Sequence, residues 1–164
     1  MKRIVYIVSI VIIGSAVLVL RPTPLPANKS MRFDSTSRQY QSIINDYRAS
    51  QGKSLLRLSA TLTQSANDKA KDMTAKGYWS HNAPDGSTPF TLIAKHNYNY
   101  INAGENLSRC YKTPEQSVAG WIASPTHREN ILADYTEMGI GIAKQSDSGC
   151  MVVVNHFGKP KVRQ

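Results

Sequence analysis

The sequence is short of acidic residues. It has 11 Asp and Glu against 20 Lys and Arg, so its formal net charge is +9. A basic exterior favours acidic partners such as phospholipid headgroups or anionic envelope polymers. The positive charges are scattered and are not clustered with aromatic residues, so we expect no nucleic-acid partner. The simpler alternative is that the charge only keeps the protein soluble.

A motif for a metalloprotease is also missing. The segment His127–Ile131 reads His-Arg-Glu-Asn-Ile and lacks the second histidine of a His-Glu-x-x-His motif. This absence excludes a metalloprotease site carried by one helix. The chain has no internal repeats either, which leaves a single folded domain as the expected organisation.

The chain has one long hydrophobic run, and it lies at the N-terminus. Lys2 and Arg3 precede an uncharged run from Ile4 to Leu20, about 17 residues, which is near the lower limit for spanning a bilayer. A basic start followed by an apolar run is typical of an export signal. Because no small-x-small cleavage site follows the run, we predict that residues 1–20 form an uncleaved membrane anchor. A removed signal peptide, which would make the protein secreted, is the alternative.

The rest of the chain is therefore expected outside the cytoplasm. Alternating prolines in residues 21–32 favour extended backbone and predict a spacer between the membrane and the domain. Residues 33–158 are the predicted folded domain, and residues 159–164 are a short basic tail.

Cysteine is scarce, with only Cys110 and Cys150 present. An even number of cysteines in an oxidising compartment favours one disulfide, with two separate buried thiols as the alternative. A bridge would close a loop of about 40 residues and stabilise the fold by about 3–4 kcal/mol in the chain-entropy model.

Apolar residues at helical spacing predict two helices early in the domain, through Tyr40–Tyr47 and Leu62–Met73. We expect Ser35 or Ser37 to be the N-cap of the first helix. Gly77 follows the second apolar stripe and is expected to end that helix.

Prolines next to capping residues predict three shorter helices. They start at Ser87-Thr88-Pro89, at Thr113-Pro114 and at Ser124-Pro125. Turn-forming residues predict a loop over residues 80–86. The residues alone also favour a loop over residues 103–108.

Two strands, Met138–Ala143 and Cys150–Phe157, are expected to close the domain as a hairpin. The run Met151–Val154 is too apolar to face water, which predicts a central strand with helices on both faces. Because the helices come first and the hairpin last, the predicted fold class is α+β.

Polar groups gather where these elements end, at Ser80-His81, Gly104–Leu107 and Ser124–Arg128. Two histidines and a carboxylate from separate segments can converge on one cation, since neutral imidazoles suit Zn²⁺. Isolated or hydrogen-bonded surface histidines are the alternative.

These segments also carry a family resemblance. Trp79-Ser80-His81, Gly104–Leu107, Trp121–Leu132 and Tyr135–Gly141 resemble, in this order, the signatures of the CAP superfamily. This superfamily is also known as the SCP domain, or the cysteine-rich secretory protein, antigen 5 and pathogenesis-related 1 family. The form Ser-Pro-x-His-Arg-x-Asn-Ile-Leu is similar to its bacterial branch.

The resemblance implies an α-β-α sandwich, with a small antiparallel sheet between helical layers and a strand near Ala103–Ser108. It also implies a cleft in which His81 and His127 are a histidine pair and Glu105 is an acid. Many members have a second acid at the position that is Ser124 here. The site therefore has one negative charge fewer, and a bound cation should be held less tightly.

Two of these residues also have purely structural interpretations. Ser124 can serve as a helix cap in place of the missing acid. Glu105 can bond backbone N–H groups and bind no ligand.

The favoured function is a non-catalytic, extracytoplasmic binding module. Its expected cofactor is Zn²⁺ or another divalent cation, or none, and its expected ligand is a lipid or an anionic envelope polymer. The alternative is a metal-dependent hydrolase or protease acting on an extracellular substrate. Ser80 is a poor nucleophile for such an enzyme, because it is adjacent to His81 and neighbouring side chains diverge.

Overall fold

The computed structural model describes residues 33–161, which belong to one compact unit, Met31–Gln164. The predicted anchor (residues 1–20) and spacer (residues 21–32) lie outside the described residues. None of the helices within residues 33–161 is long and apolar enough to cross a membrane. The unit has its own core, sheet and disulfide, so we expect it to fold when produced alone.

Residues 33–161 form five helices and four strands. The helices are α1 (Ser35–Ser50), α2 (Ala60–Lys76), α3 (Pro89–Lys95), α4 (Pro114–Ala123) and α5 (Pro125–Leu132). The strands are β1 (Arg57–Leu58), β2 (Tyr100–Arg109), β3 (Glu137–Lys144) and β4 (Met151–Pro160). The predicted helices and the closing hairpin are all present. β4 ends at Pro160, two residues inside the range assigned to the basic tail.

The helix ends follow their local signals, with one correction. Gly77 ends α2 in the left-handed conformation, as predicted, with a φ of 67°. The N-cap of α1 is Asp34, not Ser35 or Ser37, because its carboxylate accepts a hydrogen bond from the Ser37 backbone N–H at 2.7 Å. A carboxylate at this end of a helix also interacts favourably with the helix dipole.

The four strands form one sheet in the order β1-β3-β4-β2. β4 lies inside the sheet and pairs antiparallel with both β2 and β3, which confirms the predicted central strand. The sheet is mixed and not wholly antiparallel, because the two-residue strand β1 pairs parallel with β3. A strand this short carries too little periodicity to be predicted from sequence.

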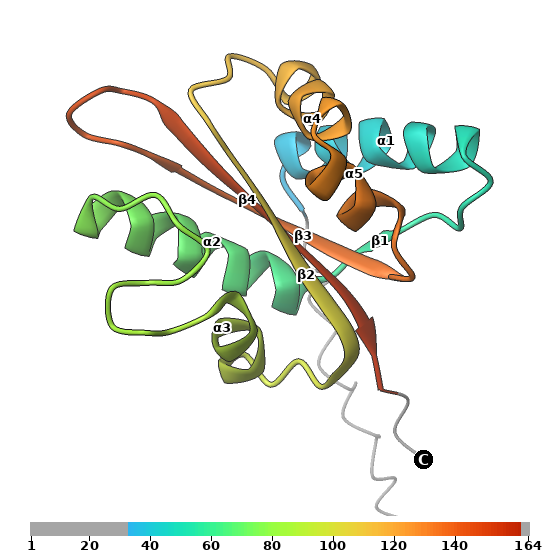
Figure 1. Cartoon of the computed structure of the whole chain (residues 1–164), viewed down its shortest axis with the longest axis horizontal. Helices are drawn as coiled ribbons and strands as arrows, with labels where there is room; N and C mark the ends of the chain where they lie inside the picture. Colours follow the sequence, from blue (N-terminus) through green and yellow to red (C-terminus); the bar gives the residue numbers. More distant parts are fainter. Residues whose placement is uncertain (1–32, 162–164) are drawn as a thin grey trace, which may run out of the picture. The chain divides into compact units, whose positions relative to one another are not determined.

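Helices cover both faces of the sheet (Figure 1). α2 and α3 lie on one face, and α1, α4 and α5 lie on the other. Two glycines of β3 allow α2 to approach closely, because a Cβ at Gly139 or Gly141 would overlap the helix backbone at Leu62 or Ala66. The α-β-α sandwich implied by the family resemblance is therefore confirmed.

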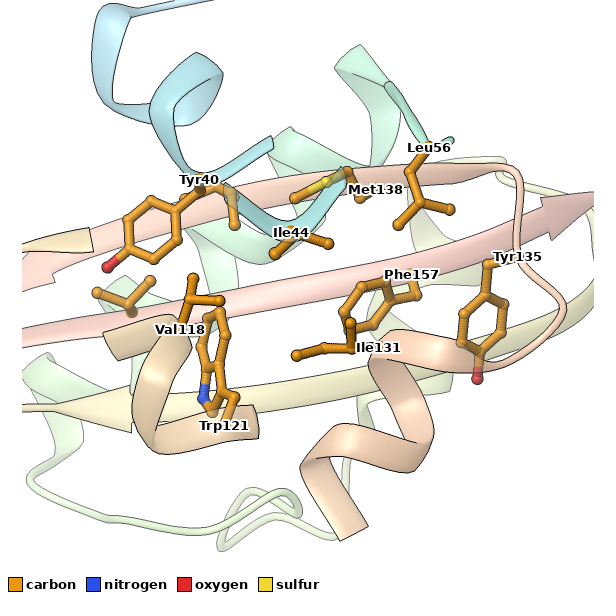
Figure 2. Close-up of a cluster of buried hydrophobic side chains, with 11 residues drawn as sticks. Tyr40, Ile44, Leu56, Val118, Trp121, Ile131, Tyr135, Met138 and Phe157 are labelled. Carbon is orange, nitrogen blue, oxygen red and sulfur yellow. The ribbon is translucent and has the colours of Figure 1, made fainter. Parts of the chain in front are cut away.

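The largest cluster of the core fills the space between the sheet and α1, α4 and α5 (Figure 2). Trp121 is buried there beside Tyr40, with their ring centroids 5.9 Å apart. The Trp121 indole N–H donates to the Leu107 carbonyl at 2.8 Å, so α4 is bonded to β2 as well as packed on the sheet.

β2 is a strand, so the loop expected over residues 103–108 from the residues alone is wrong and the strand implied by the resemblance is right. Just beyond its end, Cys110 forms a disulfide with Cys150, which precedes β4. The bridge thus joins the two neighbouring strands, and the predicted disulfide is present.

Candidate binding site

His81 and Glu105 are brought together by the fold, as predicted. His81 lies in the loop after α2, and Glu105 lies on β2. The His81 Nδ1 atom is 2.7 Å from Glu105 Oε1. The His81 side chain is 54% exposed, whereas that of Glu105 is only 2% exposed. The carboxylate is therefore an internal anchor for a surface imidazole.

The second carboxylate oxygen of Glu105 is bound by a residue that sequence analysis missed. His156 Nε2, on β4, lies 3.0 Å from Glu105 Oε2, and His156 Nδ1 lies 2.8 Å from the Ser65 hydroxyl on α2. Ser65 and His156 are fully buried. Ser65, His156 and Glu105 are therefore connected by hydrogen bonds inside the fold. The sequence did carry a signal for His156. Side chains alternate between the two faces of a strand, so His156 shares a buried face with Val152 and Val154. A polar group on such a face needs a hydrogen-bond partner, because leaving it unpaired is costly.

These contacts determine the charge of Glu105. Burial on its own would raise the pKa of Glu105, but the hydrogen bonds from His156 and His81 outweigh that effect. The net result is a pKa below the usual value for a glutamate. Glu105 is thus an ionised carboxylate at neutral pH.

The Lys69 side chain holds the backbone of the loop that carries His81. Its ammonium group donates to the His81 carbonyl oxygen at 2.6 Å and to the Tyr78 hydroxyl at 3.1 Å. The Tyr78 hydroxyl in turn donates to Asp72 at 2.6 Å. The His81 main chain and its ring are therefore held by separate groups.

His127 approaches the site from the opposite helical layer, on α5. The Asn106 side chain donates to the His127 carbonyl at 2.9 Å, which ties the first turn of α5 to β2. Burial lowers the pKa of His127, and the nearby His81 lowers it further. His127 therefore lies within electrostatic range of His81. We call His81, Glu105 and His127 the imidazole site.

Residues 41–157 match the profile of the CAP family, described as the cysteine-rich secretory protein family. The chain belongs to the CAP family. The first and last signatures read from the sequence lie within the matched range.

Two Bacillus subtilis (strain 168) proteins are similar to this CAP chain. The uncharacterized protein YkwD is 36% identical over 118 residues, which is 71% of this chain and 45% of the relative. The uncharacterized membrane protein YlbC is 25% identical over 128 residues, which is 77% of this chain and 37% of the relative. The chain thus spans less than half the length of either relative.

Solved structures share the fold. An outer surface protein from Borrelia burgdorferi superposes with a TM-score of 0.70 at 25% identity, over 76% of this chain and 92% of that one. An extracellular protein containing a SCP domain, from Bacillus anthracis, superposes with a TM-score of 0.69 at 23% identity, over 76% of this chain and 40% of that one. The CAP fold is therefore shown by both sequence and structure.

Ser124, where the family resemblance implies a second acid in many members, is the N-cap residue of α5 by position. Its side chain makes no capping hydrogen bond, and its hydroxyl lies 3.4 Å from that of Thr126. Ser124 therefore occupies the N-cap position, as expected, but its side chain does not cap the helix. A serine hydroxyl adds no negative charge to the imidazole site.

A cation at the imidazole site would have few protein ligands. Among residues 33–161, no group of three His, Cys, Asp or Glu side chains is arranged to hold a metal ion. Glu105 does not fit as a direct ligand, because both of its oxygens are engaged by imidazoles. His81 and His127 remain as donors. A metal-binding histidine usually has a carboxylate hydrogen-bonded to its other ring nitrogen. Glu105 is placed to orient His81 in this way without touching the cation itself.

The arrangement gives little support to a hydrolase. Ser65, His156 and Glu105 are connected like a catalytic triad, but a nucleophile must reach its substrate and Ser65 is fully buried. Within the described part of the chain, no other hydroxyl is hydrogen-bonded to an imidazole. Ser80 instead accepts a bond from the Asn82 backbone N–H at 3.2 Å.

Proposed function

We propose that this chain is a non-catalytic, extracytoplasmic binding module whose ligand site is the imidazole site. His81 and His127 hold a divalent cation such as Zn²⁺, and Glu105 orients His81 from behind. One observation carries the proposal: a buried carboxylate fixes an exposed imidazole within electrostatic range of a second imidazole. A carboxylate behind the ring is the usual support of a metal-binding histidine.

The extracytoplasmic location has three supports. The N-terminal sequence has the pattern of an export signal. The disulfide between Cys110 and Cys150 is of a kind that persists in oxidising compartments. Two proteins of the same fold are described as an extracellular protein and an outer surface protein.

With two protein ligands, a tetrahedral cation keeps two positions for other donors. An acidic group of a lipid or an anionic envelope polymer can fill them, and the net charge of +9 favours the approach of such ligands. The cation then links the domain to its ligand and needs no chemistry of its own.

A calorimetric Zn²⁺ titration of residues 31–164 at neutral pH tests the proposal. We expect saturable binding that is lost in the double variant His81→Ala/His127→Ala. The matched control is His96→Ala, because His96 also bonds a carboxylate, Asp68, at 2.9 Å but lies outside the imidazole site. Its affinity should equal that of the unmodified chain. No saturable binding, or equal binding by the double variant, would refute the proposal.

A further inference from the structure

A continuous hydrogen-bonded path runs from the middle of the fold to the surface of the imidazole site. It starts at Ser65 on α2, passes through His156 on β4 and Glu105 on β2, and ends at His81. Its three links measure 2.8, 3.0 and 2.7 Å. Only its last member is exposed to solvent.

The positions of the hydrogens on this path follow from the carboxylate. An ionised carboxylate only accepts hydrogen bonds. His81 must therefore present Nδ1–H, and His156 must present Nε2–H, to Glu105. A neutral imidazole has one N–H, so the His81 Nε2 atom carries its lone pair, which is the form that binds a metal.

His156 holds Glu105 Oε2 and thereby keeps Oε1 turned toward His81. The other ring nitrogen of His156, Nδ1, lies 2.8 Å from Ser65 Oγ on α2. The Ser65 hydroxyl donates to the Leu62 carbonyl at 3.0 Å, which keeps Ser65 Oγ in position beside the ring. The His156 ring is thus fixed at both nitrogens.

We infer that His156 is a positioning residue that sets the tautomer of His81 through Glu105, so that the His81 Nε2 lone pair faces outward. The inference rests on the proposed function and deepens it, because it explains how a site with two imidazoles is prepared for a cation before one arrives. The main chain of His81 is held separately by Lys69, so a change at His156 acts on the ring and leaves the loop in place.

The tautomer can be read directly from nitrogen-15 spectra of the imidazoles, recorded without metal in mildly alkaline buffer. His81→Ala identifies the His81 signals. In the unmodified chain we expect the Nδ1–H form of His81. Finding the Nε2–H form there would overturn the inference before any variant of His156 is made.

His156→Leu removes both hydrogen bonds of the ring and keeps the position apolar. Because Glu105 Oε2 is then no longer held, we expect the carboxylate to turn away from His81. His81 should become a mixture of tautomers, and the Zn²⁺ affinity should fall about tenfold, as is common when an outer partner of a ligand is lost. His156→Gln, whose amide N–H can still donate to Glu105, should restore most of the Nδ1–H form.

The control for a general loss of packing is Val154→Ala, on the same strand and equally buried. It should lower the melting temperature without changing the His81 tautomer. An unchanged tautomer in His156→Leu, or the same change in Val154→Ala, would refute the inference. If the unmodified chain binds no Zn²⁺, the proposed metal site fails, while the tautomer still decides the role of His156.

Discussion

Lys69 is the buried cation on which the loop carrying His81 depends. Burial lowers its pKa, and the negative charges of Glu105 and Asp72 oppose that shift. Its contacts with Tyr78 and the His81 carbonyl bring oxygen acceptors to an ammonium group that would otherwise be unpaired inside the fold. The residue therefore joins the surface loop to α2.

Replacing this lysine tests its role. Lys69→Met should lower the free energy of unfolding by about 1–3 kcal/mol, because two oxygen acceptors lose a charged donor. Urea unfolding of residues 31–164 measures the change. Lys71→Met, at an exposed position two residues further along the same helix, should change it by less than about 0.5 kcal/mol. Equal effects of the two substitutions would contradict the assignment.

Asp72 gives the fold a dependence on acid pH. Burial alone would raise its pKa, but bonds from Lys76 at 2.7 Å and Tyr78 at 2.6 Å lower it below the usual 3.8. A carboxylate with a lowered pKa in the folded state adds stability at any pH above its unfolded value. That contribution disappears as the pH falls through the folded pKa.

Asp72→Asn should therefore be less stable than the unmodified chain at pH 7, and the difference should close as the pH falls below about 3.8. Melting temperatures measured from pH 7 to pH 2.5 test this. Asp46→Asn removes the same charge from an exposed position of α1 and serves as the control. A difference that stays constant over this range would show that Asp72 does not act through its charge.

At the scale of elements, the start of α1 illustrates the limits of local signals. Asp34, Ser35 and Ser37 are all good N-cap residues, and sequence alone favoured the serines. The structure selects Asp34, since Ser37 is buried and donates to Asp34 through its backbone N–H. Which of several competent residues caps a helix depends on where the helix meets the core.

Asp34→Ala should destabilise residues 31–164 by about 1 kcal/mol, the usual effect of losing an N-cap. Chemical denaturation provides the measurement. Ser35→Ala at the neighbouring position should be nearly neutral, because Ser35 is exposed and is not the cap. A larger loss of stability in Ser35→Ala than in Asp34→Ala would show that the N-cap is Ser35 and not Asp34.

β2 shows a second limit of prediction from local sequence. Its residues mix apolar and polar types, and Gly104-Glu105-Asn106 has the composition of a turn. It is nevertheless a strand, because β4 pairs along it and because Asn130 and Trp121 donate to the carbonyls of Glu105 and Leu107. These partners come from distant parts of the chain, so no local pattern could predict them.

At the scale of the whole molecule, the disulfide joins β2 to β4 across 40 residues of sequence. Replacing both cysteines, Cys110→Ser/Cys150→Ser, should lower the free energy of unfolding by about 3–4 kcal/mol. Thermal unfolding compares this variant with the unmodified chain, before and after reduction. Non-reducing mass spectrometry should find one linked peptide pair in the exported protein. Two freely alkylated thiols would contradict the bridge.

The sequence by itself determined the helices, the closing hairpin, the central position of β4 and the membership of the CAP family. These features rest on apolar periodicity, on Gly and Pro near helix ends, and on motifs that lie close together in the chain, all of which are local. The pair His81 and Glu105 was also expected, through the family motifs that carry them.

Only the tertiary structure decided that Glu105 lies inside the fold, between two imidazoles, and that His156 belongs with the site. His156 is 51 residues from Glu105 and 91 from Ser65 in sequence, and these residues meet only because β4 pairs with β2 in the sheet and packs against α2. Burial, hydrogen-bond partners and the resulting pKa shifts depend on what surrounds a side chain in space. For that reason the sequence could name a site with His81 and Glu105 but could not assign the carboxylate its supporting role.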